Sequence, residues 1–143
     1  MTTPFAATDK SLETVVGRYV PSEAVADVCQ QARTFAYGEC GILAGRLHSI
    51  TGWGNVFLYD GAGGRPLPLH YCVRSPRGLV DSFGLCPHRL EYMVSSRQGV
   101  SSPVWNNSTG DAGFTDQDPG DVARADVFLD TPWMQAVLSA SGR

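Results

Sequence analysis

Cys40, His70 and Asp81 are the residues whose types and order best fit a thiol-based reaction. Cys40 lies in a Gly-Glu-Cys-Gly motif at the expected start of a helix, where backbone N–H groups and the positive helix end stabilise a thiolate. His70, on a strand, would form an ion pair with the thiolate and later deliver a proton. Asp81, on the next strand, would fix the tautomer and orientation of the imidazole. Because the helix N–H groups can also receive an oxyanion, the pattern predicts acyl transfer from an amide.

The turn Ser75-Pro76-Arg77-Gly78 decides whether His70 and Asp81 can meet. If it closes a two-stranded hairpin, position 72 faces position 81 and position 70 faces position 83. The side chains at these four positions then share one face of the sheet, and His70 and Asp81 are diagonal neighbours. A register shift of one residue would turn Asp81 to the opposite face.

Helices are expected on the N-terminal side of this hairpin. Pro21-Ser22-Glu23 predicts a helix start, and an apolar stripe leads from there to a stop at Gly38. A second helix is expected from Cys40 to Gly52, and it should cover the hairpin face that carries His70 in order to bury its own apolar side chains. Residues 55–59, 67–74 and 79–83 have the composition of strands.

The C-terminal half gives weaker signals. Residues 86–93 are expected to form a short helix, and residues 95–120, rich in Ser, Gly, Asn and Asp, a long loop. A helix should follow Asp118-Pro119-Gly120 and break at Pro132, before a last helical piece at 133–138. The expected fold is α+β, with N-terminal helices packed on a small antiparallel sheet. Residues 1–20 are expected to be a partly ordered arm, and residues 21–143 a single globular domain.

The bulk composition narrows the function classes. A chain of 143 residues can bury a core as one domain. The net charge is −3 and there is no basic run, so nucleic-acid binding is not expected. No segment resembles a signal peptide or approaches the roughly 20 apolar residues that cross a bilayer. We therefore expect no membrane association, four reduced cysteines, and a protein that works in a cytoplasm or is delivered into a target-cell cytoplasm.

The order of these motifs resembles the papain-like superfamily, and more closely its transglutaminase-like proteases, bacterial glutamine deamidases and related effector toxins. The matching pieces are GECGILAGRLHSITG, PLPLHYCVRS and GLVDSFG, within a segment spanning about a third of the chain. The resemblance implies a papain-like or transglutaminase-like core in a bacterial or phage protein, a Cys40-His70-Asp81 triad, a protein substrate and no cofactor. One feature departs from papain-type enzymes: no glutamine directly precedes Cys40, and Gln30 and Gln31 lie further upstream.

A small zinc-binding domain is one alternative. His70-x-Cys72 and Cys86-Pro-His88 together offer two sulfurs and two nitrogens, a set that zinc accepts. Neither pair has the internal gap of two to four residues that is usual in zinc fingers, although a one-residue gap on a strand places both ligands on one face.

A non-catalytic protein-binding module is the other alternative, for example a phage inhibitor, an immunity protein or an adaptor. Small acidic proteins often act by surface complementarity. In such a module Trp53, Trp105 and Trp133 could anchor a partner protein, although burial in the core is the commoner place for such side chains.

Overall fold

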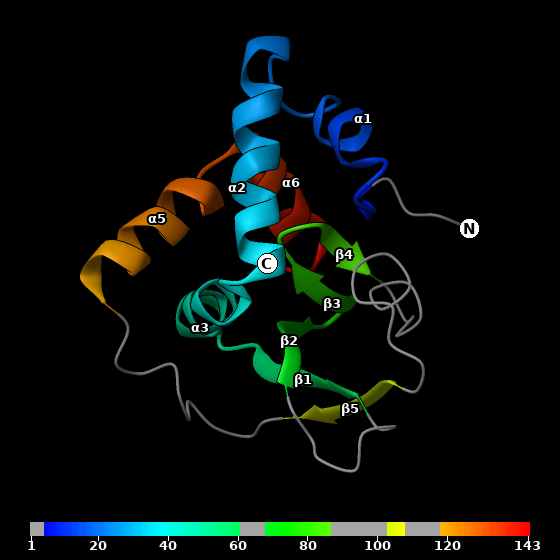
Figure 1. Ribbon diagram of the computed structural model, residues 1–143, viewed down its shortest axis with the longest axis vertical. Coiled ribbons are helices and arrows are strands. Elements are labelled where there is room, and N and C mark those ends of the chain that lie inside the picture. The colour runs from blue at the N-terminus through cyan, green and yellow to red at the C-terminus, as the bar shows by residue number, and fades with distance from the viewer. Residues whose placement is uncertain (1–4, 61–67, 87–102, 108–117) are drawn as a thin grey trace.

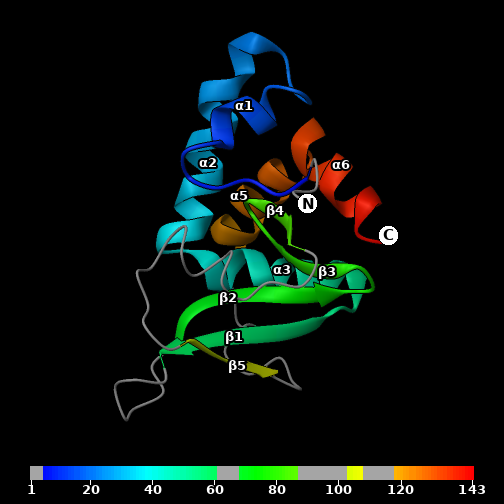
Figure 2. The same cartoon turned by 90° about the vertical axis from the view of Figure 1, so that its right-hand side faces the viewer.

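The computed structural model describes residues 5–60, 68–86, 103–107 and 118–143 of the chain. Within these ranges the strands form one antiparallel sheet, and the helices gather on one side of it (Figure 1). The view turned by 90° shows α3 lying along the sheet, with the other helices stacked beyond it (Figure 2). This arrangement confirms the α+β class with helices packed on an antiparallel sheet.

The described strands follow the order β4-β3-β2-β1-β5 across the sheet. Their bounds are β1 (Gly54–Asp60), β2 (Pro68–Ser75), β3 (Gly78–Asp81), β4 (Gly84–Cys86) and β5 (Pro103–Asn107). The strand predicted at 79–83 ends earlier, because the chain turns at Ser82 and Phe83 and returns as β4.

Strand β5 corrects the prediction of an uninterrupted loop over residues 95–120. It pairs antiparallel with β1, from Val56–Asn107 to Asp60–Pro103. The strand has only five residues and Ser- and Asn-rich flanks, so its apolar pattern is too short to be read from sequence. Cys86 closes β4, so the predicted helix at 86–93 does not begin there, and the rest of that segment is outside the described residues.

The other predicted helices are present with the expected stops. A 3₁₀ turn (Ser22–Ala24) leads into α2 (Val25–Tyr37), which ends at Gly38, and α3 (Cys40–Thr51) ends at Gly52 with a φ of 76°. The C-terminal helices are α5 (Pro119–Leu129) and α6 (Pro132–Ala140). The side chains of Asp118 and Thr131 accept N–H groups at their starts, so each helix has an N-cap.

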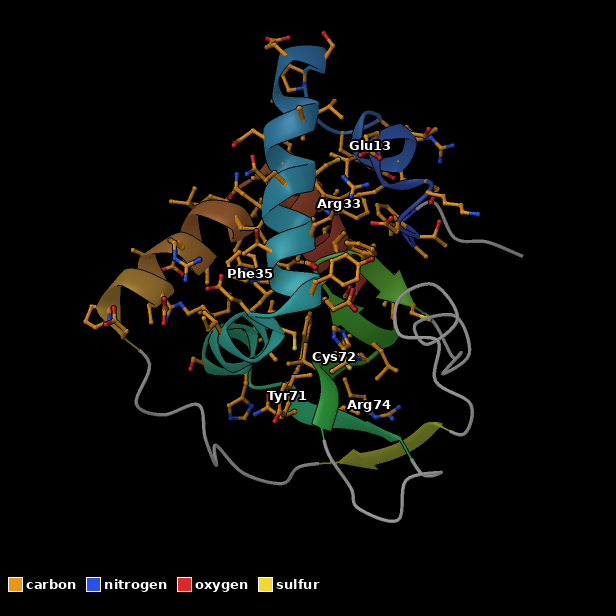
Figure 3. The ribbon with its side chains drawn as sticks, viewed as in Figure 1. Glu13, Arg33, Phe35, Tyr71, Cys72 and Arg74 are labelled. Carbon is orange, nitrogen blue, oxygen red and sulfur yellow. The ribbon has the colours of Figure 1, made fainter. Side chains whose placement is uncertain are left out.

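The N-terminal segment packs onto this body from Phe5 onward. Ala6 forms a bridge with Gly84, and the short helix α1 (Leu12–Val16) buries Leu12 completely. Arg33 of α2 holds the segment by an ion pair to Glu13, with 2.6 Å between Nη1 and Oε1, and the two side chains point toward one another in Figure 3. A second ion pair joins Arg33 to Asp9, at 2.9 Å between Nε and Oδ1.

The face of the sheet that α3 covers differs from the prediction. Leu43 and Leu47 of α3 share the main core with Val73 and Val80, whereas Cys72 belongs to a separate buried cluster. Strand side chains alternate between faces, so the odd-numbered residues of β2 meet the helix layer. Figure 3 shows Tyr71 on the α3 side of β2 and Arg74 on the other. The predicted packing of α3 on the face of Cys72 was therefore wrong.

Candidate active site

Cys40 is the first residue of α3 and lies at the junction with α2. Gly38 ends α2 with extended backbone, and Glu39 is the N-cap residue but makes no side-chain cap. The Glu39 carboxylate turns instead to Arg124 of α5 in a two-point ion pair, at 2.6 and 3.0 Å. The half-buried thiol of Cys40 thus lies at the start of a helix, where the backbone N–H groups of the first turn are able to stabilise a negative charge.

The surroundings of the Cys40 sulfur favour its thiolate. Burial alone raises the pKa of Cys40, but a hydrogen bond with His70 and the charge of that ring lower it, and so do hydrogen bonds from the backbone of Tyr71 and Gly41. The net effect places the pKa of Cys40 below that of an ordinary cysteine. The structure therefore brings Cys40 and His70 together, as a nucleophile paired with a base requires.

His70 and Asp81 form a buried pair behind the sulfur. His70 is 1% exposed and Asp81 4% exposed, and Nε2 of the imidazole lies 2.9 Å from Oδ2 of the carboxylate. Because Nε2 is engaged by Asp81, Nδ1 is the ring nitrogen that a hydrogen bond to the thiol would use. A single imidazole thus links a thiol on one side to a carboxylate on the other.

The hairpin register explains how His70 meets Asp81. Strand β2 pairs with β3 through Val73–Val80 and Ser75–Gly78, which is the predicted register. The ladder ends at Val73, so β3 diverges from β2 just before Asp81, and the carboxylate reaches diagonally across the gap. The predicted His70–Asp81 hydrogen bond is confirmed, although positions 70 and 83 are not paired in the ladder.

The same divergence explains how Cys40 reaches His70 although α3 packs on the other face. At Tyr71 the edge of β2 is no longer paired with β3, and the backbone of Tyr71 hydrogen-bonds the sulfur of Cys40. The thiol therefore approaches the strand at its edge, near the boundary between the two faces. The end of the β2–β3 pairing thus lets Cys40 interact with His70 from the edge of the strand.

Ser82 and Trp133 also belong to the site, although the sequence analysis did not predict a role for them there. Ser82 and Trp133 are fully buried, and the indole Nε1 of Trp133 donates to the carbonyl of Ser82 at 3.1 Å. The Asp-Ser-Phe-Gly sequence that contains Ser82 is typical of an Asx turn, so the turn at Ser82 could have been predicted from the sequence. No local signal marks Trp133, whose partner is 51 residues away.

The structure brings together the two cysteines of the zinc alternative, Cys72 and Cys86. Cys72 and Cys86 belong to the second buried cluster, with Val56 and Leu79. Among the described residues no three His, Cys, Asp or Glu side chains are grouped to hold a metal ion, and His88 is outside those residues. His48, the remaining histidine, binds the carbonyl of Trp53 through Nδ1 at 2.7 Å and so secures the end of α3.

The upstream glutamines have another place in the fold. Gln30 and Gln31 line a groove of about 420 Å³ between α2 and α5, and Gln31 donates to Asp27 at 2.9 Å. The backbone N–H groups of Gly41 and Tyr71, rather than a glutamine amide, are therefore the donors that reach the sulfur. An oxyanion formed at Cys40 would find its donors among such backbone groups.

Comparison with known proteins assigns no family. The chain matches no protein-family model, and no curated protein or solved structure is significantly similar to it. None of the helices in the described parts of the chain is long and apolar enough to cross a membrane. The functional assignment therefore rests on the geometry around Cys40.

Proposed function

We propose that the protein is a thiol-dependent acyl-transfer enzyme that acts on an amide of a protein substrate. The observation that carries the proposal is the buried imidazole of His70, which interacts with Asp81 at one nitrogen and with the Cys40 thiol. Cysteine, histidine and aspartate occur in this order in the transglutaminase-like and papain-like enzymes that the sequence motifs resemble. A core of that kind would account for the arrangement.

The first half-reaction uses the thiolate of Cys40 as the nucleophile. Its sulfur attacks the carbonyl carbon of a side-chain or main-chain amide, and the carbonyl oxygen takes up negative charge. Backbone N–H groups near the start of α3 stabilise that charge. His70, which holds the proton taken from the thiol, delivers it to the nitrogen, and ammonia or an amine leaves as a thioester forms.

The second half-reaction resolves the thioester. His70, now neutral, takes a proton from an incoming water, whose oxygen attacks the thioester carbonyl. A carboxylic acid leaves and Cys40 returns to its starting state. Asp81 keeps the ring in one tautomer and stabilises its charged form throughout. An amine in place of water would give a crosslinked product, so protease, deamidase and transglutaminase share this site chemistry.

Thioester trapping tests the proposal. The protein is incubated with a casein or glutamine-peptide substrate and hydroxylamine, and hydroxamate is measured together with ammonia and newly exposed amino ends. We expect turnover that is lost in Cys40→Ser and retained in Cys29→Ser, a matched control at a buried cysteine of α2. Ammonia, new amino ends or incorporated amine identify deamidase, protease or transglutaminase activity. Turnover that is unchanged in Cys40→Ser would overturn the assignment.

A protein-binding module is the second candidate, and the groove between α2 and α5 favours it. Val127 is 62% exposed at the rim of the groove, and among the residues whose burial is described few large apolar side chains are exposed. A binding module would keep its partner when Cys40 is replaced by Ser. It would lose the partner when Val127 is replaced by Asp, so the two variants separate the candidates.

A further inference from the structure

The turn that follows Asp81 is fixed to three other parts of the molecule. Ser82 Oγ donates to the carbonyl of Ala32 in α2 at 2.6 Å, and the Ser82 carbonyl accepts the Trp133 indole N–H of α6 at 3.1 Å. The carbonyl of Phe83 accepts the backbone N–H of Ala7 at 2.9 Å, from the N-terminal segment. A two-residue turn is thus anchored to two helices and to a third segment.

This turn also sets the direction of the Asp81 carboxylate. The backbone N–H of Phe83 donates to Oδ1 of Asp81 at 2.8 Å, while Oδ2 interacts with His70. One carboxylate oxygen of Asp81 is therefore held by the turn, and the other interacts with the imidazole. If the turn moves, Oδ1 moves with Phe83, and the line from Oδ2 to the imidazole changes.

The hydrogen bonds that Ser82 makes with Ala32 and Trp133 hold the turn firmly because they are buried. Ser82 and Trp133 are fully buried, so water cannot easily replace either hydrogen bond. Loss of the indole donor leaves the buried Ser82 carbonyl without this partner, and loss of the Ser82 hydroxyl removes the hydrogen bond that ties the turn to α2. Catalytic groups tolerate displacements of only about half an ångström.

We propose that Ser82 and Trp133 are positioning residues, which hold Asp81 in the orientation that His70 requires by fixing the turn between β3 and β4. Neither side chain touches the sulfur, so each acts only through Asp81. The catalytic meaning of the inference rests on the proposed function. The geometric coupling can be measured without any substrate.

The test follows the thiol of Cys40 by its rate of alkylation with iodoacetamide as a function of pH. We expect Ser82→Ala and Trp133→Phe to move the profile to higher pH by about half a pKa unit, a roughly threefold loss of thiolate at low pH. Asp81→Asn should move it further. In the Asp81→Asn background the two substitutions should add no further shift, because their route to the sulfur is already interrupted.

Phe128→Leu is the matched control, because Phe128 is a fully buried aromatic residue that packs on Phe35 rather than on the turn. It should lower the melting temperature and leave the alkylation profile unchanged. Other charged groups near the site are unaltered in these variants: Glu39 stays paired with Arg124. Trp133→Phe keeps the aromatic bulk, and Ser82→Ala provides a second route if the indole variant does not fold.

The outcomes separate this inference from the proposed function. An unchanged profile in both variants, or a shift that persists in the Asp81→Asn background, would overturn the positioning role. Coupling without any turnover of amide substrates would support the positioning role and count against the enzyme. Turnover of amide substrates with an unchanged alkylation profile in both variants would support the enzyme and count against the positioning role.

Discussion

Nε2 of His70 lies 2.9 Å from Oδ2 of Asp81, across the gap that opens where β3 leaves β2. Both residues are almost completely buried, so water competes little for this hydrogen bond. The carboxylate is also bound by the N–H of Phe83, which leaves it little freedom to turn. A buried, oriented carboxylate of this kind is what a catalytic histidine needs in order to keep one tautomer.

Asp81→Asn should therefore leave the fold in place and impair catalysis. The amide has the shape of the carboxylate but cannot stabilise an imidazolium, and it can favour the wrong tautomer. We expect turnover of an amide substrate to fall by about 10³–10⁴-fold, by analogy with other triads. Circular dichroism checks the fold, and an Asp126→Asn variant in α5 serves as the control at a partly buried ion pair with Arg46. Equal activity of the two variants would contradict an orienting role for Asp81.

Cys40 should be the first of the four cysteines to react. It is half-buried with a lowered pKa, whereas the other three are buried and burial raises the pKa of Cys29. Limiting iodoacetamide at neutral pH, followed by peptide mass spectrometry, measures the order of labelling. Preferential labelling of Cys29, Cys72 or Cys86 would count against the thiol mechanism.

The pH dependence of that labelling should report the contact with His70. Burial raises the pKa of Cys40, and the hydrogen bond and charge of His70 more than offset it together with the backbone N–H groups. The thiolate is the reactive form, so the wild-type rate should rise at lower pH than for a free thiol such as N-acetylcysteine. His70→Gln removes the hydrogen bond and the charge of the ring but keeps the burial and the backbone N–H groups, so its profile should shift to higher pH. An identical profile would show that His70 does not act on the sulfur.

The hairpin and the helix ends could be predicted because local rules fix them. The Ser75–Gly78 turn sets the register, and Gly38 and Gly52 end their helices. The face covered by α3 could not be predicted, because β3 is buried on both faces and shows no alternation. Both faces of a strand look alike in sequence when neither meets water.

The contacts that orient Asp81 could not be predicted from the sequence, for a different reason. Ala32 and Trp133 are 50 and 51 residues from Ser82, and only tertiary packing brings them together. The backbone of Tyr71 hydrogen-bonds the sulfur of Cys40, and a pattern of side chains in the sequence does not predict a contact made by the backbone. The residue types of the proposed triad could be predicted from sequence, whereas the residues that hold it in place could not.

Zinc should not bind in stoichiometric amount through His70 and Cys72. Nε2 of His70 is engaged by Asp81, and Cys72 packs in an apolar cluster with Val56 and Leu79. Metal analysis of the purified protein, before and after chelator treatment, measures this directly. One zinc per chain, with unfolding on its removal, would make His70 a structural ligand and exclude the proposed mechanism.

Gly84 should tolerate no side chain, because it combines a φ of 114° with close contact to the N-terminal segment. A Cβ at this position would lie 1.7 Å from the carbonyl oxygen of Phe5 and 3.1 Å from Trp133. Gly52 is the matched control: its φ of 76° is also left-handed, but a Cβ there would meet open space. We expect Gly52→Ala to lower the free energy of unfolding by about 1–2 kcal/mol, the cost of a left-handed backbone. Gly84→Ala should cost more than about 4 kcal/mol, because the N-terminal segment at Phe5 must also separate from β4. Urea unfolding of both variants measures the difference, and similar losses would mean that Phe5 is not held against the turn that carries Asp81.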